Sequence, residues 1–490
     1  MKAKRPQVLI TLDETSEEPL YLQVYEAIRQ QILSGAIREG EKVPSIRSVV
    51  QELGISHATV ERAYTQLALE GYVQAVPRSG YVAAHLDLGY FHEAAEQPQE
   101  EKQSTMESKS VEFYDEAREG DEARYDFAYT SLQPGSFPRR TWRRLSSEVI
   151  RDMDDAELVS YYHKSEPCLL QKQLADYLQR ARGVHCQPEQ VILQPGTEAA
   201  ITSVIQLVQT PGEILELAHE EPGFDVMVAV ARRFGAHLIS APSQGEASDF
   251  LRALDEANPK LIFTTPSHQF PTGNMMPLEV RIRLLQWAAD HDAYIIEDDS
   301  CNEYRYETRA IPSLQSMDRN NRVIYMCNFS KALSPGLRIA YFVLPPLLLE
   351  KWNSLFTFSY DTISYTVREV LGLFLQRGYW DTHLRRMVTG NKKRHDELVA
   401  AFEKEFGNRV TLFGKDSGMH LYVQVHNDMS QKQLLQSAFD QGVKVYGTQR
   451  YYWSGNNVPE DFVIVGFSAI LQEDILPGVQ ALRRAWFPQE

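Results

Sequence analysis

Apolar residues near the start of the chain follow a helical spacing. Val24, Ile28 and Ile32 recur every fourth position after Pro19, which predicts an amphipathic helix that ends near Gly35. Because a helix of this period turns one face toward a core, these three side chains are the expected core of the first element.

Two further helices and a hairpin are expected next. A short helix is predicted over residues 44–53, and a third over residues 56–70 with Ser56 as its N-cap. Residues 71–82 bracket two strands joined by a hairpin whose tip carries Arg78. Three helices followed by such a hairpin have the spacing of a winged helix-turn-helix, whose third helix enters the major groove of DNA.

The periodic pattern stops after the hairpin. Residues 87–126 hold thirteen acidic residues against four basic ones, which is -9 of the net charge of -16. A self-repelling stretch rich in Gln and Ser predicts an extended linker, assigned to residues 87–124. Residues 1–86 carry nine basic and ten acidic residues, so any DNA-binding face there must be a local concentration of charge.

Short apolar runs then alternate with longer helical patterns. The runs, at residues 190–193, 261–264, 293–297 and 322–326, have the length of buried strands. This alternation predicts an α/β domain with a largely parallel sheet over residues 125–490. With 490 residues and 43% apolar content, the chain is long enough for two or more separate cores.

Composition excludes several classes of protein. The four cysteines have neither close pairing nor zinc-ligand spacing, so we assign no metal site and expect a reducing compartment. We find no signal core at the N-terminus and no apolar run as long as a membrane span. These features predict a cytoplasmic protein without membrane partners.

The segment 19–82 resembles the GntR-type winged helix, with matches at residues 40–47, 56–64 and 70–72. The resemblance implies DNA binding, with protein binding by the same module as the alternative. The expected DNA contacts are Ser45, Arg47, Ser56, His57, Thr59, Arg62 and Arg78. The family usually has arginine at the position of His57, so that contact is expected to be weaker or pH-dependent.

Residues 328–338 place Lys331 seven residues before Arg338, across a Pro-Gly turn. This segment resembles the pyridoxal-phosphate (PLP) lysine segment of class I aminotransferases. The resemblance implies that residues 125–490 have the α/β fold of type I PLP-dependent transferases. It also implies a Schiff base on Lys331, with Ser330 beside it, and a phosphate contact from Arg338.

Three further motifs fit a PLP site. Gly196 and Thr197 follow an apolar strand and open a helix, so their N–H groups could cradle the phosphate. Asp298 ends a strand and matches the aspartate that keeps the pyridine nitrogen of PLP protonated in the resembled enzymes. Asp299 is expected to cap a helix instead. Phe224 stands where these enzymes stack an aromatic ring on the cofactor, with a core phenylalanine as the alternative.

The loop at residues 265–273 narrows the resemblance to MocR-type regulators, which join a GntR module to an aminotransferase-like domain. Its Ser-His-Gln stretch makes His268 a candidate to approach the ring or an effector, with local hydrogen bonding as the alternative. Two residues depart from the resembled pattern. Phe270 replaces an asparagine, and Ser300 a tyrosine, that would hold the cofactor's phenolic oxygen.

Two more departures bear on activity. Asn328 stands where Ser or Thr commonly contacts the phosphate, and Ile464 where an arginine clamps the substrate carboxylate. Since an apolar residue cannot replace a bidentate clamp, an amino-acid substrate would lose roughly 2 to 5 kcal/mol of oriented binding. Efficient transamination is therefore not expected.

Three functional hypotheses follow. The first is a transcription factor that holds PLP as a Lys331 Schiff base and responds to PLP or an amine effector. The second is an active aminotransferase with an appended DNA-binding module, which needs a carboxylate-binding arginine from elsewhere, such as Arg450. The third is a scaffold that has the fold but lacks the cofactor.

The resemblance also implies a homodimer. The linker 87–124 is long enough for each DNA-binding module to exchange onto the partner's large domain. Tyr161 or Tyr162 is a candidate for a phosphate contact across such a dimer.

Overall fold

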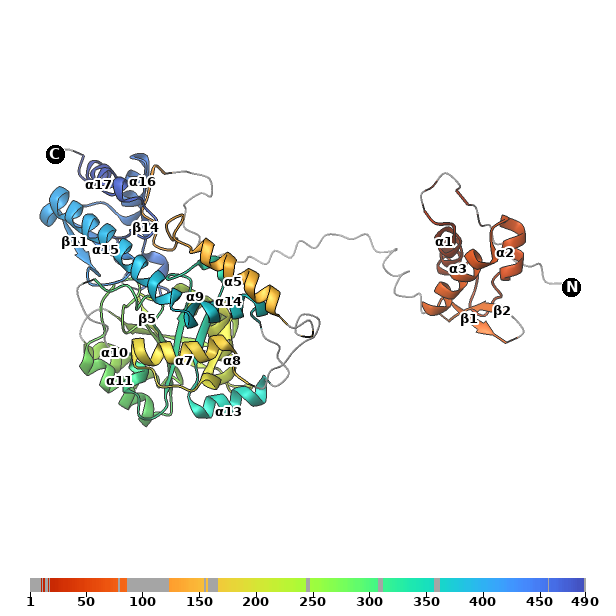
Figure 1. Ribbon diagram of the computed structural model, residues 1–490, viewed down its shortest axis with the longest axis horizontal. Helices are drawn as coiled ribbons and strands as arrows, with labels where there is room; N and C mark the ends of the chain where they lie inside the picture. The colour runs from red at the N-terminus through yellow and green to blue at the C-terminus, as the bar shows by residue number, and fades with distance from the viewer. Residues whose placement is uncertain are drawn as a thin grey trace. The chain divides into compact units, whose positions relative to one another are not determined.

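The computed structural model describes residues 10, 12–13, 16, 18–77, 80–85, 123–153, 156, 166–243, 247–306, 312–356, 362–456 and 458–488. The chain divides into two compact units, Met1–Val111 and Glu112–Glu490 (Figure 1). Nearly all of the predicted linker, with Arg78, Tyr161 and Tyr162, lies outside the described residues.

The N-terminal unit consists of three helices and a hairpin. The elements are α1 (Leu20–Leu33), α2 (Ile46–Leu53), α3 (His57–Leu69), β1 (Val73–Val76) and β2 (Gly80–Ala83), and the two strands pair antiparallel. Val24, Ile28 and Ile32 are the buried residues of α1, which confirms the prediction from their spacing. Ser56 caps α3 by accepting the N–H of Thr59, as predicted.

A seven-stranded sheet organises the C-terminal unit, in the order β4-β10-β9-β8-β7-β5-β6. The strands are β4 (Val191–Gln194), β5 (Glu216–Glu221), β6 (His237–Pro242), β7 (Leu261–Thr264), β8 (Tyr294–Asp298), β9 (Val323–Asn328) and β10 (Ala340–Val343). Only β10, among these strands, runs antiparallel to its neighbours. The four predicted strands are confirmed, three of them to within one residue at each end, while β9 extends two residues beyond the predicted run.

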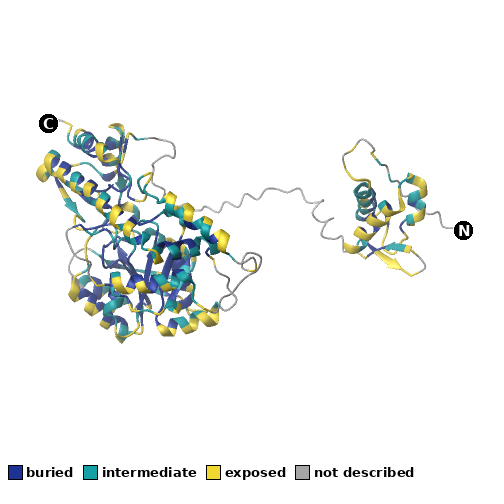
Figure 2. Ribbon diagram, in the orientation of Figure 1, coloured by how far each residue is buried: buried dark blue, intermediate teal, exposed yellow. Residues whose placement is uncertain are grey.

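Helices cover both faces of this sheet. Adjacent residues Ile295 and Ile296 of β8 pack into different apolar clusters, because successive side chains of a strand point to opposite faces. Figure 2 shows the buried strands in dark blue within a layer of helices. The helices of this part are α5 (Arg139–Asp152), α7 (Leu169–Arg182), α8 (Thr197–Val208), α9 (Asp225–Arg233), α10 (Ala247–Ala257), α11 (Leu278–Asp290), α12 (Leu314–Met317), α13 (Pro346–Leu355) and α14 (Tyr365–Gln376).

The C-terminal part of the chain, from Tyr379 onward, adds a smaller sheet of four strands, in the order β11-β12-β15-β14. Its elements are α15 (Tyr379–Phe406), β11 (Val410–Phe413), β12 (His420–Val425), α16 (Gln431–Asp440), β14 (Tyr446–Gly447), β15 (Phe462–Gly466) and α17 (Gln472–Trp486). The strand β3 (Tyr125–Asp126) pairs parallel with β13 (Val443–Lys444), so residues just after the linker join this part. Of the helices described, none is long and apolar enough to cross a membrane.

Candidate functional site

The chemistry-bearing motifs meet at one edge of the large sheet. The strands β4, β8 and β9 run in the same direction, and their carboxyl ends lead into Gly196, Asp298 and Lys331. Because β10 runs the other way, its preceding residue Arg338 reaches the same edge. Ligands of open α/β sheets bind at this edge, beyond the carboxyl ends of the strands.

Gly196, Thr197 and Arg338 lie together at the start of α8. Gly196 is the N-cap of this helix with φ 103°, and Thr197 is the first helical residue. A Cβ on Gly196 would lie 2.3 Å from Nη2 of Arg338, so the glycine leaves the room that the guanidinium occupies. A guanidinium next to the free N–H groups of a helix N-terminus is an arrangement of donors that binds phosphate.

Lys331 lies in the turn after β9. Its Nζ donates a hydrogen bond to the carbonyl oxygen of Tyr129, at 3.0 Å, and its own carbonyl accepts from Tyr304 Oη at 2.8 Å. Burial lowers the pKa of Lys331. A lowered pKa increases the fraction of neutral amine, which is the form that attacks a carbonyl carbon.

A chain of hydrogen bonds joins two residues that depart from the resembled pattern. Asn328 Nδ2 donates to Ser300 Oγ at 2.8 Å and to Thr197 Oγ1 at 3.1 Å. Ser300 Oγ in turn donates to Asp298 Oδ1, which also accepts the Ser300 N–H at 3.0 Å. The backbone N–H of Ser330 donates to Asn328 Oδ1 at 2.9 Å. Burial raises the pKa of Asp298 to about 6.

Phe224 lies between the core and the site. Its ring stacks on Phe263 with centroids 6.3 Å apart and meets Phe270 edge-on at 6.2 Å. It packs partly buried against the apolar cluster on one face of the sheet. The structure therefore supports the core interpretation of Phe224 and leaves the stacking role a prediction.

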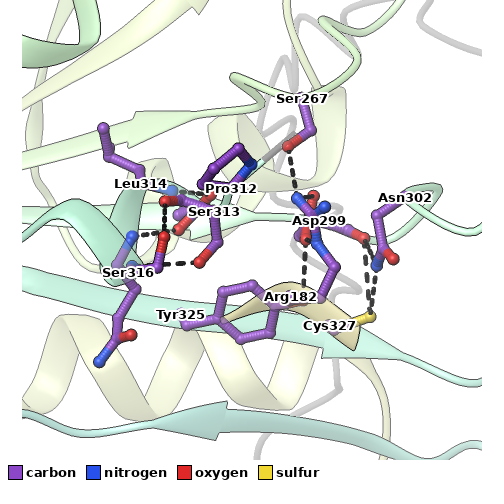
Figure 3. A network of polar contacts seen from close by, with 12 residues as sticks. Arg182, Ser267, Asp299, Asn302, Pro312, Ser313, Leu314, Ser316, Tyr325 and Cys327 are labelled. Carbon is purple, nitrogen blue, oxygen red and sulfur yellow. Dashed lines mark hydrogen bonds and ion pairs between the residues drawn. The ribbon is translucent and has the colours of Figure 1, made fainter. Parts of the chain in front are cut away.

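Asp299 has a different role from the predicted one. Its carboxylate accepts from Arg182 Nε at 2.6 Å, from Arg182 Nη2 at 3.2 Å and from Tyr325 Oη at 2.8 Å. Figure 3 shows this buried network, in which Arg182 also donates to Ser267 Oγ at 2.9 Å. Asp299 is thus one half of a buried ion pair, and the prediction of a helix cap was wrong.

The carboxylate that meets a helix start in this region is that of Glu297. Its oxygens accept the N–H groups of Leu314 at 2.6 Å and Gln315 at 2.9 Å, at the start of α12. Three acids follow one another here, Glu297, Asp298 and Asp299, and only the tertiary structure shows that Glu297 is the one that caps α12.

His268 is held locally. Its Nδ1 lies 2.9 Å from Ser417 Oγ, and the ring is packed against Gly418, where a Cβ would lie 2.2 Å from Nε2. Burial lowers the pKa of His268 to about 3, so the ring is neutral at physiological pH. This geometry favours local hydrogen bonding over an approach to the ring or effector.

Phe270 and Ile464 both belong to aromatic packing. The Phe270 ring meets the ring of Tyr451 edge-on at 4.9 Å, and Ile464 is fully buried in a cluster with Tyr129, Tyr422 and Tyr451. Neither side chain can donate a hydrogen bond. The positions that hold polar clamps in the resembled enzymes are therefore apolar in three dimensions as well as in sequence.

Arg450 lies beside the same cluster. Its Nη2 donates to Tyr129 Oη at 2.5 Å and to Tyr451 Oη at 2.6 Å, and its Nε is 3.5 Å from Asp225 Oδ2. Tyr129 therefore connects Arg450, through its hydroxyl, with Lys331, through its carbonyl.

Six predicted DNA-contacting residues are described in the N-terminal module. Ser45 caps α2 and Ser56 caps α3, while Thr59 Oγ1 lies 2.7 Å from Ser56 Oγ. Exposed side chains of this set are Ser45, Arg47, Ser56, His57 and Arg62, and Thr59 is partly buried.

Two of these side chains have neighbours in their own module. Arg62 lies over the ring of Tyr21, 3.9 Å from its centroid, and His57 Nδ1 is 3.5 Å from Glu61. The carboxylate of Glu61 lowers the electrostatic potential around His57, which leaves Arg47 as a stronger candidate than His57 for a phosphate contact.

Glu303 is expected to make the free energy of unfolding depend on pH. Burial raises its pKa to about 8 from an ordinary 4.5, and its Oε2 is buried without a hydrogen-bond partner. The folded state therefore keeps a proton that the unfolded chain releases between these pH values, so the stability from this group is lost as pH rises to about 8. Glu303→Gln is expected to remove up to about 1.4 kcal/mol per pH unit from the slope of the free energy of unfolding against pH. Urea unfolding at pH 6 and 8 measures this slope.

The matched control for this prediction is the exposed Glu460, whose change to Gln should leave the slope unaltered. Equal pH slopes in wild type and Glu303→Gln would show that Glu303 ionises at its ordinary pKa.

Comparisons with known proteins support the fold found for the N-terminal unit and the fold found for the C-terminal unit. The family of bacterial regulatory proteins called gntR matches residues 20–82. The chain is 35% identical to the HTH-type transcriptional regulator YhdI of Bacillus subtilis (strain 168), over 97% of this chain and 98% of YhdI. It is 31% identical to the probable rhizopine catabolism regulatory protein MocR of Rhizobium meliloti, over 98% of this chain and 97% of that protein.

Solved structures resemble the C-terminal unit. A kynurenine aminotransferase from Pyrococcus horikoshii superposes with a TM-score of 0.66 at 22% identity, covering 75% of this chain and 91% of the enzyme. The predicted fold class, a winged helix-turn-helix followed by an α/β domain of aminotransferase type, is confirmed. The chain therefore belongs to the MocR-type family of HTH transcriptional regulators, with a GntR DNA-binding domain ahead of an aminotransferase-like domain.

Proposed function

We propose that this regulator binds PLP through Lys331 and changes its DNA binding in response to PLP or to an amine effector. The observation that carries the proposal is the convergence of an amine, a guanidinium and a carboxylate at one sheet edge. They belong to Lys331, Arg338 and Asp298, and they match the three charged partners that PLP needs.

The hydrogen-bond donors at the start of α8 fit the phosphate of PLP. Gly196 leaves space for the Arg338 guanidinium, and Thr197 opens α8 with a hydroxyl beside the free N–H groups. Phosphate is a doubly charged acceptor, so a guanidinium and a helix N-terminus together favour it over a carboxylate.

The ring end fits as well. When bound, PLP supplies an aldehyde that condenses reversibly with primary amines. The buried Asp298 would face the pyridine nitrogen and Lys331 would supply the amine. A primary-amine effector can compete with Lys331 for the same carbon, which is a chemical basis for sensing amines.

Sensing is favoured over turnover by the apolar residues of the site. Phe270 and Ile464 offer no hydrogen-bond donor, and Ile464 is enclosed by aromatic rings. An amino-acid substrate would therefore lack its usual carboxylate clamp. The second candidate, an active aminotransferase, is favoured only by Arg450, whose guanidinium contacts Tyr129 beside Lys331.

We further propose a homodimer in which the DNA-binding modules exchange between subunits. Two modules on a symmetric dimer would bind paired half-sites, as dimeric helix-turn-helix proteins do.

The test measures DNA affinity of the full-length protein on a duplex that the protein selects from random sequences. Adding PLP, or PLP with members of a primary-amine panel, is expected to shift the dissociation constant about 5- to 150-fold, the usual range of allosteric coupling. Arg47→Ala is expected to weaken binding by about 1 to 3 kcal/mol, whereas the exposed Arg38→Ala serves as control. An unchanged affinity with PLP and every amine would contradict the sensing proposal.

The same amines, incubated with PLP-loaded protein and a panel of 2-oxo acids, separate the two candidates. Transfer of more than one amino group per bound PLP would favour the aminotransferase.

A further inference from the structure

We infer that Asn328 and Ser300 act as one orienting pair that couples the ring end of the cofactor site to its phosphate end. The inference rests on the proposed binding of PLP. Each residue departs from the pattern of the resembled enzymes, and the two side chains meet across neighbouring strands at 2.8 Å.

Donor and acceptor chemistry fixes the direction of the hydrogen bonds. An amide NH2 group has two protons and can only donate, so Asn328 gives one to Ser300 and one to Thr197. Each hydroxyl then accepts from Asn328 and keeps its single proton for another partner. The Asn328 amide is held in this orientation because its Oδ1 accepts the Ser330 N–H at 2.9 Å.

The two hydroxyl protons therefore point to opposite ends of the site. The proton of Ser300 goes to Oδ1 of Asp298, the carboxylate assigned to the pyridine nitrogen. The proton of Thr197 is free of Asn328 and available to an acceptor at the start of α8, where the phosphate is assigned. A serine or threonine at position 328 could not donate to both hydroxyls, because it has one proton.

Asn328 is thus a positioning residue for both ends, rather than a phosphate contact alone. Ser300 is its hydrogen-bond partner. The two departures from the pattern of the resembled enzymes, at positions 300 and 328, therefore belong to one hydrogen-bonded unit. The two residues lie 28 positions apart in sequence, and they meet because β8 and β9 are neighbours in the sheet.

The experiment compares PLP with pyridoxal, which lacks the phosphate, by titration of visible absorbance. Thr197→Val is expected to weaken PLP several-fold and leave pyridoxal unchanged, because it removes only the phosphate-end hydroxyl. Ser300→Ala is expected to weaken pyridoxal several-fold. Asn328→Ser should show both defects, weakening pyridoxal and also reducing the advantage of PLP over pyridoxal, each by about 2- to 10-fold per lost hydrogen bond.

Two further variants sharpen the result. Adding Ser300→Ala to Asn328→Ser should weaken the binding of pyridoxal no further, since the pair is already broken. Ser300→Thr alone should bind pyridoxal as the wild type does, because it keeps the hydroxyl. Asn328→Thr is a second variant at the same position, and thermal unfolding of each cofactor-free protein reports its folding.

The outcomes are distinguishable. If Asn328→Ser reduces only the advantage of PLP over pyridoxal, Asn328 is a simple phosphate contact and the inference is overturned. Additive effects of Asn328→Ser and Ser300→Ala on pyridoxal would overturn it as well. Wild-type protein that binds neither compound would instead contradict the proposed function.

Discussion

Replacing Lys331 by alanine is expected to abolish the visible absorbance that PLP gives to the wild-type protein. The absorbance depends on an imine with an amine of the protein, and Lys331 is the lysine at the sheet edge where the phosphate and ring partners meet. Its lowered pKa favours the neutral amine that this bond requires. The measurement is a spectral titration of purified full-length protein with PLP.

Lys404→Ala is the matched control, because Lys404 is an exposed lysine on α15. It should keep the full absorbance. A band of wild-type strength in Lys331→Ala would move the anchor to another lysine, and a colourless wild-type protein would support a scaffold without cofactor. If the regulator senses its ligand through this bond, Lys331→Ala should also lose the response of DNA binding to PLP and amines.

Replacing Arg182 by methionine is expected to lower the free energy of unfolding by about 3 to 5 kcal/mol, the usual cost of leaving one charge of a buried pair without its partner. The side chains of Arg182 and Asp299 are 1% and 0% exposed, and their closest atoms are 2.6 Å apart. Methionine fills a similar length but cannot neutralise Asp299 or donate to Ser267. Urea unfolding of the cofactor-free protein gives the difference.

The exposed pair Arg233 and Glu198 provides the control, with side chains 57% and 55% exposed. Arg233→Met should change stability by less than about 1 kcal/mol, because solvent screens such pairs. Adding Asp299→Asn to Arg182→Met should recover part of the loss, since the amide carries no charge. A small effect of Arg182→Met alone would mean that water or rearrangement stabilises Asp299 in the variant.

The buried ion pair also has a place in the proposed function. Asp299 directly follows Asp298, and Arg182 links it to Ser267 in the loop that carries His268 and Phe270. Loss of this link is therefore expected to loosen the loop as well as the strand end that carries Asp298.

Helix faces, helix caps and strand positions could be predicted from the sequence, because each depends on residues close together in the chain. The spacing of Val24, Ile28 and Ile32 predicted the buried face of α1, and Ser56 was identified as the cap of α3. Short apolar runs predicted β7 and β8 to within one residue at each end. Periodicity and capping succeed here because the energies involved act over a few residues.

Partners across the sheet could not be predicted in the same way. Asp299 was assigned to a helix cap because a strand-end acid often has that role, whereas its partner Arg182 is 117 residues away at the end of α7. Arg182 had no signal in the sequence, since a basic residue in the last turn of a helix is commonly a surface residue that complements the helix dipole.

Motifs along the chain were sufficient to predict a DNA-binding module joined to an aminotransferase-like domain, and to identify the residues that depart from the enzyme pattern. The contact between Ser300 and Asn328, and that between Arg450 and Tyr129, 321 residues away, became visible only in the folded chain. The physical reason is that hydrogen bonds between side chains depend on which strands are neighbours and on which face each residue points. Strand order is set by the packing of the whole domain, and no local pattern of polar and apolar residues encodes it.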